Sequence, residues 1–259
     1  MEPEKRAAAA AELLAAAWRD QRRVSLPDDL VPQDLDAGTA IQDELAPRLG
    51  LECVGWKLGL TSTAGQAREG YDRPFTGRLF RETVRSSPAT FAPNTFRQPL
   101  LEGEIAFRME CPLAARARPF DEGEVLDAVA SAFVCVEVAD VRYAAPWPFP
   151  MPLLAADNGA AGGFVIGPDI ANWRERDLSL IEATLEIDGR HVADALAGAE
   201  RTDAVAALVW AANELSRRGY GLRAGDLVTT GSATVPTRCD GGVTAVARFA
   251  GIGEVRVTL

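Results

Sequence analysis

The sequence has 259 residues, of which 47% are hydrophobic and 25% are charged, ordinary values for a globular protein with a large core. The net charge is −10 and the sequence contains no basic cluster, which argues against nucleic acid or an anionic membrane as the main partner. No apolar run approaches the ~18 residues that a membrane-spanning helix needs, and the acidic, alanine-rich start lacks the pattern of a signal peptide.

The first part of the chain is predicted to be helical. Residues 3–23 form an alanine-rich helix with a proline in its first turn and arginines in its last. A second helix is predicted over residues 34–49 and ends at Gly50. Residues 53–62 alternate like a strand and then enter a polar loop, and residues 63–98 are rich in glycine and proline turns.

From residue 99 onward, strand patterns dominate, interrupted by predicted helices at about 121–131 and 202–218. The predicted strands lie near residues 100–109, 132–141, 162–167, 180–188, 226–230, 243–249 and 252–258. This order predicts an α+β fold, with a small helical N-terminal portion on a β-rich body. We expect a division into residues 1–98 and 99–259, with one continuous domain as the alternative.

The cysteines and the single histidine limit the chemistry. The four cysteines show no CxxC spacing, which predicts buried, reduced thiols in a cytoplasmic protein rather than zinc ligands or disulfides. They are Cys53, Cys111, Cys135 and Cys239. His191 follows an Asp-Gly-Arg turn sequence, so we expect it to be exposed at a hairpin tip. A single histidine argues against a Ser/His/Asp or Cys/His nucleophilic site.

Three glutamates occupy unusual places in the predicted strands. Glu102 and Glu104 are two residues apart, so both side chains point to the same face. Glu137 lies within an apolar, β-branched run that predicts a strand buried on both faces. One interpretation is that these glutamates face water, as most strand glutamates do. The other is that they converge in a dry site, which would require a cation, and oxygen ligands favour Mg²⁺, Mn²⁺ or Ca²⁺ over zinc and copper.

Taken together, several segments of the chain carry a family resemblance. The sequence resembles the 2-keto-4-pentenoate hydratase and 4-oxalocrotonate decarboxylase family, within the fumarylacetoacetate hydrolase superfamily. The matching segments are "GWKLGLTS" (55–62), "GYDRPFTGRLF" (70–80), "LEGEIAF" (101–107), "VEVADVR" (136–142), "DNGAAGGFVIG" (157–167), "LRAGDLVTTGS" (222–232) and "FAGIGEVRVTL" (249–259). They span most of the chain in the family's order.

The resemblance implies roles for individual residues. It implies that the ligands of a divalent metal, usually Mg²⁺ with Mn²⁺ as a substitute, are Glu102, Glu104 and Glu137. It also implies that Lys57 is the catalytic lysine, although an ordinary salt bridge is the alternative. Thr61, Ser62 and Asp157 are expected to contact the substrate, with helix or turn capping as the alternative for each.

The sequence also departs from the family pattern at polar positions. Phe75 stands where the family usually has an aspartate, and Ala160 and Ala161 stand where it usually has serines. Val141 replaces another serine, and the family's Pro-Gly-Asp near the C-terminus reads Asp-Gly-Gly over residues 240–242. Apolar side chains cannot hold an attacking water by hydrogen bonds, so these departures affect hydration more than metal binding or enolisation.

The resemblance implies a Mg²⁺-dependent lyase that hydrates a short 2-oxo-enoic or 2-hydroxy-dienoic acid from the breakdown of aromatic rings. Decarboxylation or keto–enol isomerisation is the alternative enzymatic function, and a non-catalytic partner subunit is the alternative from another class. Hydrolytic members of the superfamily activate water with a histidine–carboxylate pair, so the lone His191 argues against carbon–carbon hydrolysis. The expected partners are a small anionic 2-oxo acid and further copies of the chain in a homo-oligomer, with an association with a pathway enzyme left open.

Overall fold

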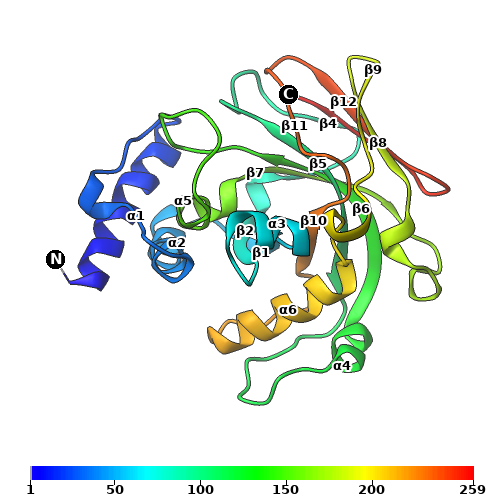
Figure 1. The fold of residues 1–259 in the computed structure, drawn as a ribbon, viewed down its shortest axis with the longest axis horizontal. Coiled ribbons are helices and arrows are strands. Elements are labelled where there is room, and N and C mark those ends of the chain that lie inside the picture. Colours follow the sequence, from blue (N-terminus) through cyan, green and yellow to red (C-terminus); the bar gives the residue numbers. More distant parts are fainter. Residues whose placement is uncertain (1) are drawn as a thin grey trace.

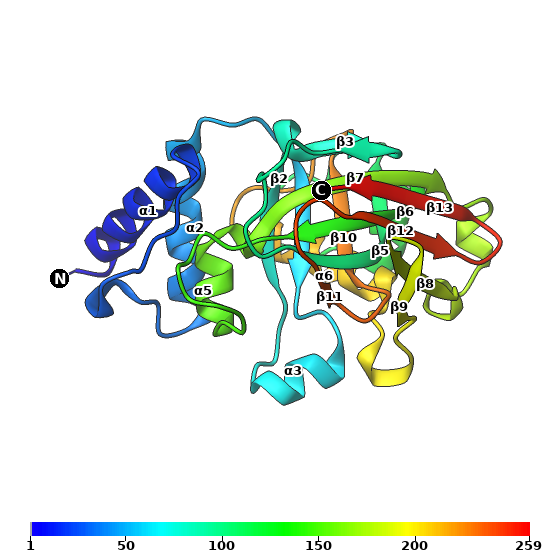
Figure 2. The same cartoon turned by 90° about the horizontal axis from the view of Figure 1, so that it is seen from above.

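Two N-terminal helices and one helix from the middle of the chain form a layer beside the sheets in the computed structural model, which describes residues 2–259 (Figure 1 and Figure 2). The helices of this layer are α1 (Pro3–Arg19), α2 (Leu35–Leu49) and α5 (Met151–Ala156). Helix α2 packs against both α1 and α5. Asp34 caps α2 by accepting a hydrogen bond from the backbone N–H of Ala37 at 2.8 Å, and Gly50 ends it with φ +66°.

A large, strongly curved sheet forms the centre of the molecule (Figure 1). Its strands run in the order β2-β1-β10-β5-β6-β7-β3, and β11 pairs with β5. Their bounds are β1 (Cys53–Gly59), β2 (Phe75–Phe80), β3 (Val84–Ser86), β5 (Leu100–Met109), β6 (Val129–Ala139), β7 (Ala161–Asp169), β10 (Leu227–Ser232) and β11 (Thr237–Arg238). β1 with β10 and β3 with β7 are parallel pairs, and the other neighbours are antiparallel.

A second sheet packs on one face of the first and has the strand order β4-β13-β12-β8-β9. Its strands are β4 (Ala89–Thr90), β8 (Ala183–Ile187), β9 (Arg190–Asp194), β12 (Thr244–Phe249) and β13 (Gly253–Thr258). The main hydrophobic core includes side chains from both sheets and from α6 (Ala204–Arg217). The remaining helices are α3 (Thr63–Glu69), α4 (Glu122–Asp127) and the short 3₁₀ turns η1 (Asp28–Leu30), η2 (Arg81–Thr83), η3 (Asn158–Ala160), η4 (Trp173–Glu175), η5 (Leu178–Leu180) and η6 (Gly198–Glu200).

Alternation along β5 and β6 separates the two faces of the large sheet. Ile105 and Phe107 of β5 belong to the main core, whereas Ala106 belongs to a small buried cluster with Phe133 and Cys135 of β6. Because side chains two apart share a face, Glu102 and Glu104 lie on the side of Ala106, and Glu137 lies on the side of Cys135. The sheet therefore turns its three glutamates away from the main core.

The sequence predictions fail mainly in the turn-rich region. Residues 63–98 contain α3, the fully buried strand β2 and two short strands. The sequence does not predict β2, because turn residues flank it and, with no exposed face, it shows no alternating pattern. The predicted first helix ends at Arg19, and the predicted helix at 121–131 ends at Asp127 because β6 begins at Val129. Helix α5 and strand β9 were not predicted.

The expected division between residues 98 and 99 does not separate the large sheet. Strands β1, β2 and β3 precede this position, and β5, β6, β7 and β10 follow it. All seven belong to one sheet, so the β-rich body includes residues from about 53 onward. The alternative of one continuous domain agrees better with this arrangement.

The prediction that the cysteines are buried is correct for only one of the four. Cys135 is buried, but Cys111 is exposed in the bend after β5, and Cys53 and Cys239 are partly exposed. All four are free thiols. His191 is exposed near the turn between β8 and β9, as expected. Within residues 2–259, no helix has the length and apolar character needed to span a membrane.

Candidate active site

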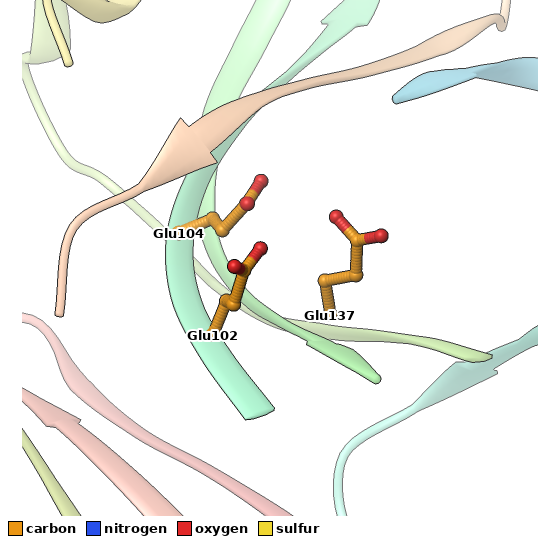
Figure 3. A group of neighbouring side chains, drawn as sticks. All are labelled: Glu102, Glu104 and Glu137. Carbon is orange, nitrogen blue, oxygen red and sulfur yellow. The ribbon is translucent and has the colours of Figure 1, made fainter. Parts of the chain in front are cut away.

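Three carboxylates converge on the glutamate face of the large sheet. Glu102 and Glu104 come from β5, and Glu137 lies directly opposite Glu102 in the antiparallel pairing of β5 with β6. One carboxylate oxygen from each residue lies within 4.8 Å of the other two. Figure 3 shows the three side chains directed toward a common space. The two-residue spacing and the strand register together produce this cluster.

The cluster is buried and lacks enough internal partners. Glu104 and Glu137 are 0% and 1% exposed, whereas Glu102 is partly exposed. Glu104 Oε2 accepts hydrogen bonds from Thr229 Oγ1 and from the backbone N–H of Gly231, the latter at 3.1 Å. Glu104 Oε1 and Glu137 Oε2 have no hydrogen-bond partner. Buried carboxylate oxygens without partners are costly, so the arrangement fits a divalent cation bound through oxygen.

Burial and mutual repulsion also change the acidity of these groups. Burial, and then the charges of Glu137 and Glu102, raise the pKa of Glu104 well above its usual range. Burial raises the pKa of Glu137 to about 7, although the nearby Lys57 opposes this shift. A bound cation would remove this preference for protons and favour the ionised carboxylates.

Lys57 enters the same site from β1. Its Nζ lies 2.8 Å from Glu137 Oε1 and donates a hydrogen bond to the carbonyl of Gly159 at 2.9 Å. The lysine is only 4% exposed. Burial by itself would lower the pKa of Lys57, but the charges of the three glutamates outweigh burial and raise it. Lys57 is therefore a buried cation placed directly against the cluster.

The carbonyl that holds Lys57 belongs to a left-handed turn. Asn158, Gly159 and Ala160 all have positive φ values, of 52°, 67° and 58°. Asn158 fixes this turn on β2, because its Oδ1 accepts from the backbone N–H of Arg78 at 2.7 Å and its Nδ2 donates to the Arg78 carbonyl at 2.9 Å. Gly77 permits the close approach, since a Cβ there would lie 2.3 Å from the Asn158 carbonyl oxygen.

Asp157 does not line the cavity described below. Its carboxylate accepts hydrogen bonds from the backbone N–H and from Nε of Arg142, both at 2.7 Å. Asp157 is 0% exposed, and burial raises its pKa despite the opposing Arg142 charge. The position of Asp157 therefore does not fit the expected substrate contact. It fits a structural role, in which Asp157 anchors the turn at residues 158–160.

A cavity of about 480 Å³ opens beside the cluster. Lys57, Glu102, Thr61 and Ser62 all line it. Thr61 Oγ1 lies 2.7 Å from Thr202 Oγ1, and Ser62 Oγ caps α3 by accepting from a backbone N–H at 3.1 Å. Thr61 and Ser62 are thus at the expected place, but their hydroxyls already have protein partners.

Two of the sequence departures also reach the cavity. Phe75 and Ala160, which stand at positions where the resemblance implies polar residues, line it. Ala161 begins β7 and Val141 is fully buried, and neither lines the cavity. Residues 240–242 lie in the turn that leads to β12, also outside the lining.

Sequence reasoning gave no individual role to four residues that complete the site. Thr229 and Gly231 hold Glu104, Gly159 holds Lys57, and Arg142 holds the turn through Asp157. Thr229 and Gly231 lie in the small, polar "TTGS" end of β10, which was a weak signal. Backbone donors and acceptors leave no signature of their own in a sequence.

Comparison with known families agrees with this geometry. The family model described as fumarylacetoacetate (FAA) hydrolase C-terminal matches residues 68–259. The chain is 31% identical over 259 residues to a 2-keto-4-pentenoate hydratase of Paraburkholderia xenovorans, covering 99% of this chain and 95% of the relative. It is 29% identical over 208 residues to a 4-oxalocrotonate decarboxylase of a Pseudomonas species, covering 80% and 78%.

Solved structures show the same fold. The 4-oxalocrotonate decarboxylase of Pseudomonas putida G7, complexed with magnesium and adipate, aligns with a TM-score of 0.87 at 26% identity and covers 100% of this chain and 98% of that one. A fumarylpyruvate hydrolase of Pseudomonas aeruginosa, in complex with Mn²⁺ and pyruvate, aligns with a TM-score of 0.54 at 16% identity, over 78% and 87%. The second likeness concerns the fold alone.

Proposed function

Because the chain belongs to the fumarylacetoacetate hydrolase family, we propose that it is a Mg²⁺-dependent lyase that hydrates a short 2-oxo-enoic or 2-hydroxy-dienoic acid. The observation that carries this proposal is the buried cluster of Glu102, Glu104 and Glu137 with Lys57 against it. Catabolism of aromatic ring-cleavage products is the corresponding metabolic setting. We further propose a homo-oligomer in the cytoplasm, the location that cysteines without CxxC spacing favour.

The residues of the site fit both a Mg²⁺ cofactor and a 2-oxo acid substrate. Glu102, Glu104 and Glu137 would hold Mg²⁺, with Mn²⁺ as a substitute, because all their donor atoms are oxygens. Bound Mg²⁺ would supply Lewis-acid polarisation at the 2-oxo group of the substrate. Lys57 lines the cavity, and its ammonium group would carry a proton between the 2-oxygen and a carbon of the dienoate. Thr61 and Ser62 form the adjoining rim.

One observation favours a second reaction, the keto–enol isomerisation or decarboxylation of the same kind of acid. The cavity wall beside Lys57 carries Phe75 and Ala160, which cannot position a water. Losing one such hydrogen bond costs about 1–3 kcal/mol. We therefore expect ketonisation or decarboxylation to be at least as efficient as hydration.

Product analysis tests these two reactions against each other. 2-Hydroxypenta-2,4-dienoate and 4-oxalocrotonate are supplied separately with Mg²⁺ in deuterated buffer, and the products are followed by NMR. Efficient formation of 4-hydroxy-2-oxopentanoate, without decarboxylation and without solvent exchange beyond that route, would support hydration and exclude the second reaction. Rapid exchange or loss of carbon dioxide would favour the second reaction.

A non-catalytic partner subunit remains the alternative outside enzymes. The intact set of three glutamates and a buried lysine counts against it, because a scaffold needs neither. Metal analysis of the purified protein, with and without added Mg²⁺, separates the two. A protein that holds no divalent ion under either condition would contradict the lyase proposal.

A further inference from the structure

We propose, as an extension that rests on the proposed function, that Trp18 and Arg142 are positioning residues for Lys57, so that helix α1 sets the placement of the catalytic lysine. Neither Trp18 nor Arg142 lines the cavity beside the glutamate cluster. Both act through the turn η3, whose Gly159 carbonyl accepts the hydrogen bond of Lys57 Nζ at 2.9 Å. The contacts described below form a continuous chain from α1 to the lysine.

The turn η3 confines the carbon chain of Lys57 as well as its ammonium group. A Cβ at Gly159 would lie 2.9 Å from Lys57 Cδ, and a Cβ at Gly77 of β2 would lie 3.0 Å from the same atom. The side chain of Lys57 is therefore enclosed between the turn and β2, while Glu137 Oε1 lies 2.8 Å from its Nζ. Because the packing is this close, a shift of the turn must also move the lysine.

Arg142 holds both ends of this turn. Its Nε and Nη2 donate to the side chain and the carbonyl of Asp157, at 2.7 and 3.0 Å, and its Nη1 donates to the carbonyl of Ala161 at 3.0 Å. Asp157 comes immediately before the turn, and Ala161 comes immediately after it. A planar, forked guanidinium group can donate in all of these directions at once. The ammonium group of a lysine would keep the charge but would not span both ends of the turn.

The end of α1 holds Arg142 in its turn. Trp18 is the only aromatic residue of this helix, and its ring centroid lies 4.0 Å from Arg142 Cζ. Trp18 also packs edge to face on Phe80 at the end of β2, with 5.8 Å between the ring centroids. Just after the helix, the backbone N–H of Val24 donates to the Arg142 carbonyl at 2.8 Å. The side chain and the backbone of Arg142 are therefore both held by α1 and the segment that follows it.

Trp18 also shields the ion pair of Arg142 with Asp157 from water. The side chain of Arg142 is 11% exposed and that of Asp157 is 0% exposed. A separate cavity of about 190 Å³ is lined by Trp18 and Arg142. Trp18→Ala would extend this cavity over the guanidinium group, and the water admitted there would weaken the cation–π attraction and the hydrogen bonds of Arg142. This substitution therefore loosens the turn without leaving a buried charge unpaired.

Lysine NMR tests the placement of Lys57 without any turnover. Protein labelled with ¹³C-lysine gives side-chain signals from Lys57 and from the exposed Lys5 alone, because the sequence has no other lysine. In the metal-free protein, the two Cε protons of a fixed Lys57 should have separate chemical shifts, whereas those of a mobile Lys5 should coincide. Trp18→Ala and Arg142→Lys should each move the Lys57 signal toward that of a mobile lysine. Trp18→Phe keeps an aromatic face and should recover most of the original signal.

Steady-state kinetics with 2-hydroxypenta-2,4-dienoate and saturating Mg²⁺ give the second measurement. The substitutions leave the metal ligands in place, so kcat should fall while KM stays within about twofold. Arg142→Lys should lower kcat by about 10–100-fold, since misplacing a group by about 1 Å can cost about 100-fold. Trp18→Ala should lower kcat by about three- to tenfold, and Trp18→Phe should recover most of that loss.

Trp210→Ala is the matched control. It removes another half-buried tryptophan from a helix, α6, and Trp210 lines a groove that includes none of the residues in the chain of contacts from α1 to Lys57. It should change neither the Lys57 signal nor kcat. An equal effect of Trp210→Ala and Trp18→Ala would mean that a general loss of packing moves the lysine, and it would overturn the inference.

The remaining outcomes separate this inference from the proposed function. Unchanged Lys57 signals and unchanged kcat in Trp18→Ala and Arg142→Lys would overturn the positioning role and leave the proposed function standing. If the unmodified protein converted no 2-hydroxydienoate, the proposed function would fail. The NMR comparison would then still decide whether α1 fixes the lysine.

Discussion

Glu104 is the ligand candidate that the protein itself holds most firmly. It is 0% exposed and its Oε2 is held by Thr229 and Gly231, while its Oε1 has no hydrogen-bond partner. The fixed oxygen orients the carboxylate, and the free oxygen is available to a cation. Glu102, by contrast, is partly exposed and lines the cavity.

The first prediction concerns this carboxylate. Glu104→Gln keeps the shape of the side chain but removes a charged ligand, so Mg²⁺ affinity measured by calorimetry should fall by at least about 100-fold, since even outer-shell changes cost about 10–100-fold. Glu110→Gln, at an exposed position just beyond the end of β5, is the control and should bind Mg²⁺ like the unmodified protein. Equal affinity in the Glu104 variant would remove this residue from the metal site.

The second prediction concerns the lysine. The sequence has only two lysines, and Lys5 is exposed on α1. Lys57→Ala should retain Mg²⁺ binding but lose turnover by about two to four powers of ten, the usual range for a proton-transfer group. Lys5→Ala should leave the turnover number unchanged. A folded Lys57→Ala protein with normal turnover would make the buried ion pair with Glu137 purely structural.

At the scale of elements, the turn η3 connects the helical layer to the site. It follows α5 and leads directly into β7, and its Gly159 carbonyl holds Lys57. Left-handed backbone at three successive residues is unfavourable for any residue other than glycine. The paired hydrogen bonds of Asn158 to β2 offset part of that cost, beside the bonds of Arg142 to Asp157 at the start of the turn.

The third prediction tests the contribution of Asn158. Asn158→Ala leaves a buried N–H and a buried carbonyl of Arg78 without partners and should lower the free energy of unfolding by about 2–4 kcal/mol, measured by urea denaturation. Asn172→Ala is the matched control, because Asn172 also has φ 52° but is exposed and makes no capping hydrogen bond. A similar loss in both variants would mean that the backbone conformation alone sets the cost.

The sequence predicted most elements that show a clear pattern. The alanine-rich first helix, the Asp34-to-Gly50 helix and the strands bearing the glutamates were located well, because caps and two-residue alternation are local signals. Strand β2 was missed because every residue in it is buried, which removes the alternation. Contacts of Asn158 with Arg78 cross 80 positions, and no local pattern encodes them.

The same limit applies to the site. Glu102 and Glu104 share a face by spacing alone, but their meeting with Glu137 depends on the register of β5 and β6. The family resemblance supplied that pairing where the sequence pattern could not. For Asp157 the expected substrate contact stays a prediction, while the structure places its carboxylate in a buried ion pair with Arg142, outside the cavity lining.

At the scale of the whole molecule, the site links parts of the chain that are distant in sequence. Lys57 comes from β1, two glutamates come from β5 and the third comes from β6, and all three strands belong to one sheet. A metal ion bound at this point would therefore stabilise the sheet as a unit. A ligand present at 100 times its dissociation constant adds about 2.7 kcal/mol to the free energy of unfolding.

The last prediction is the pH dependence of that global stability. The pKa of Glu137 is raised from 4.5 to about 7 in the metal-free protein, chiefly by burial. Between these two values the folded state binds more protons than the unfolded state, so the free energy of unfolding should decrease as pH rises from about 4.5 to about 7. Mg²⁺ binds the ionised carboxylates, so its affinity should increase over the same interval and its stabilising effect should grow.

Urea denaturation at pH 5, 6 and 7, with chelator or with saturating Mg²⁺, measures both effects. The chelated protein should lose stability toward pH 7, and Mg²⁺ should restore most of what is lost. Glu137→Gln removes one of the two buried carboxylates of the cluster with a raised pKa, so its chelated form should show a flatter profile, with Glu104 still contributing, and a weaker response to Mg²⁺. If the chelated protein instead gained stability steadily from pH 5 to 7, other titrating groups would dominate and the buried cluster would not control the stability of the fold.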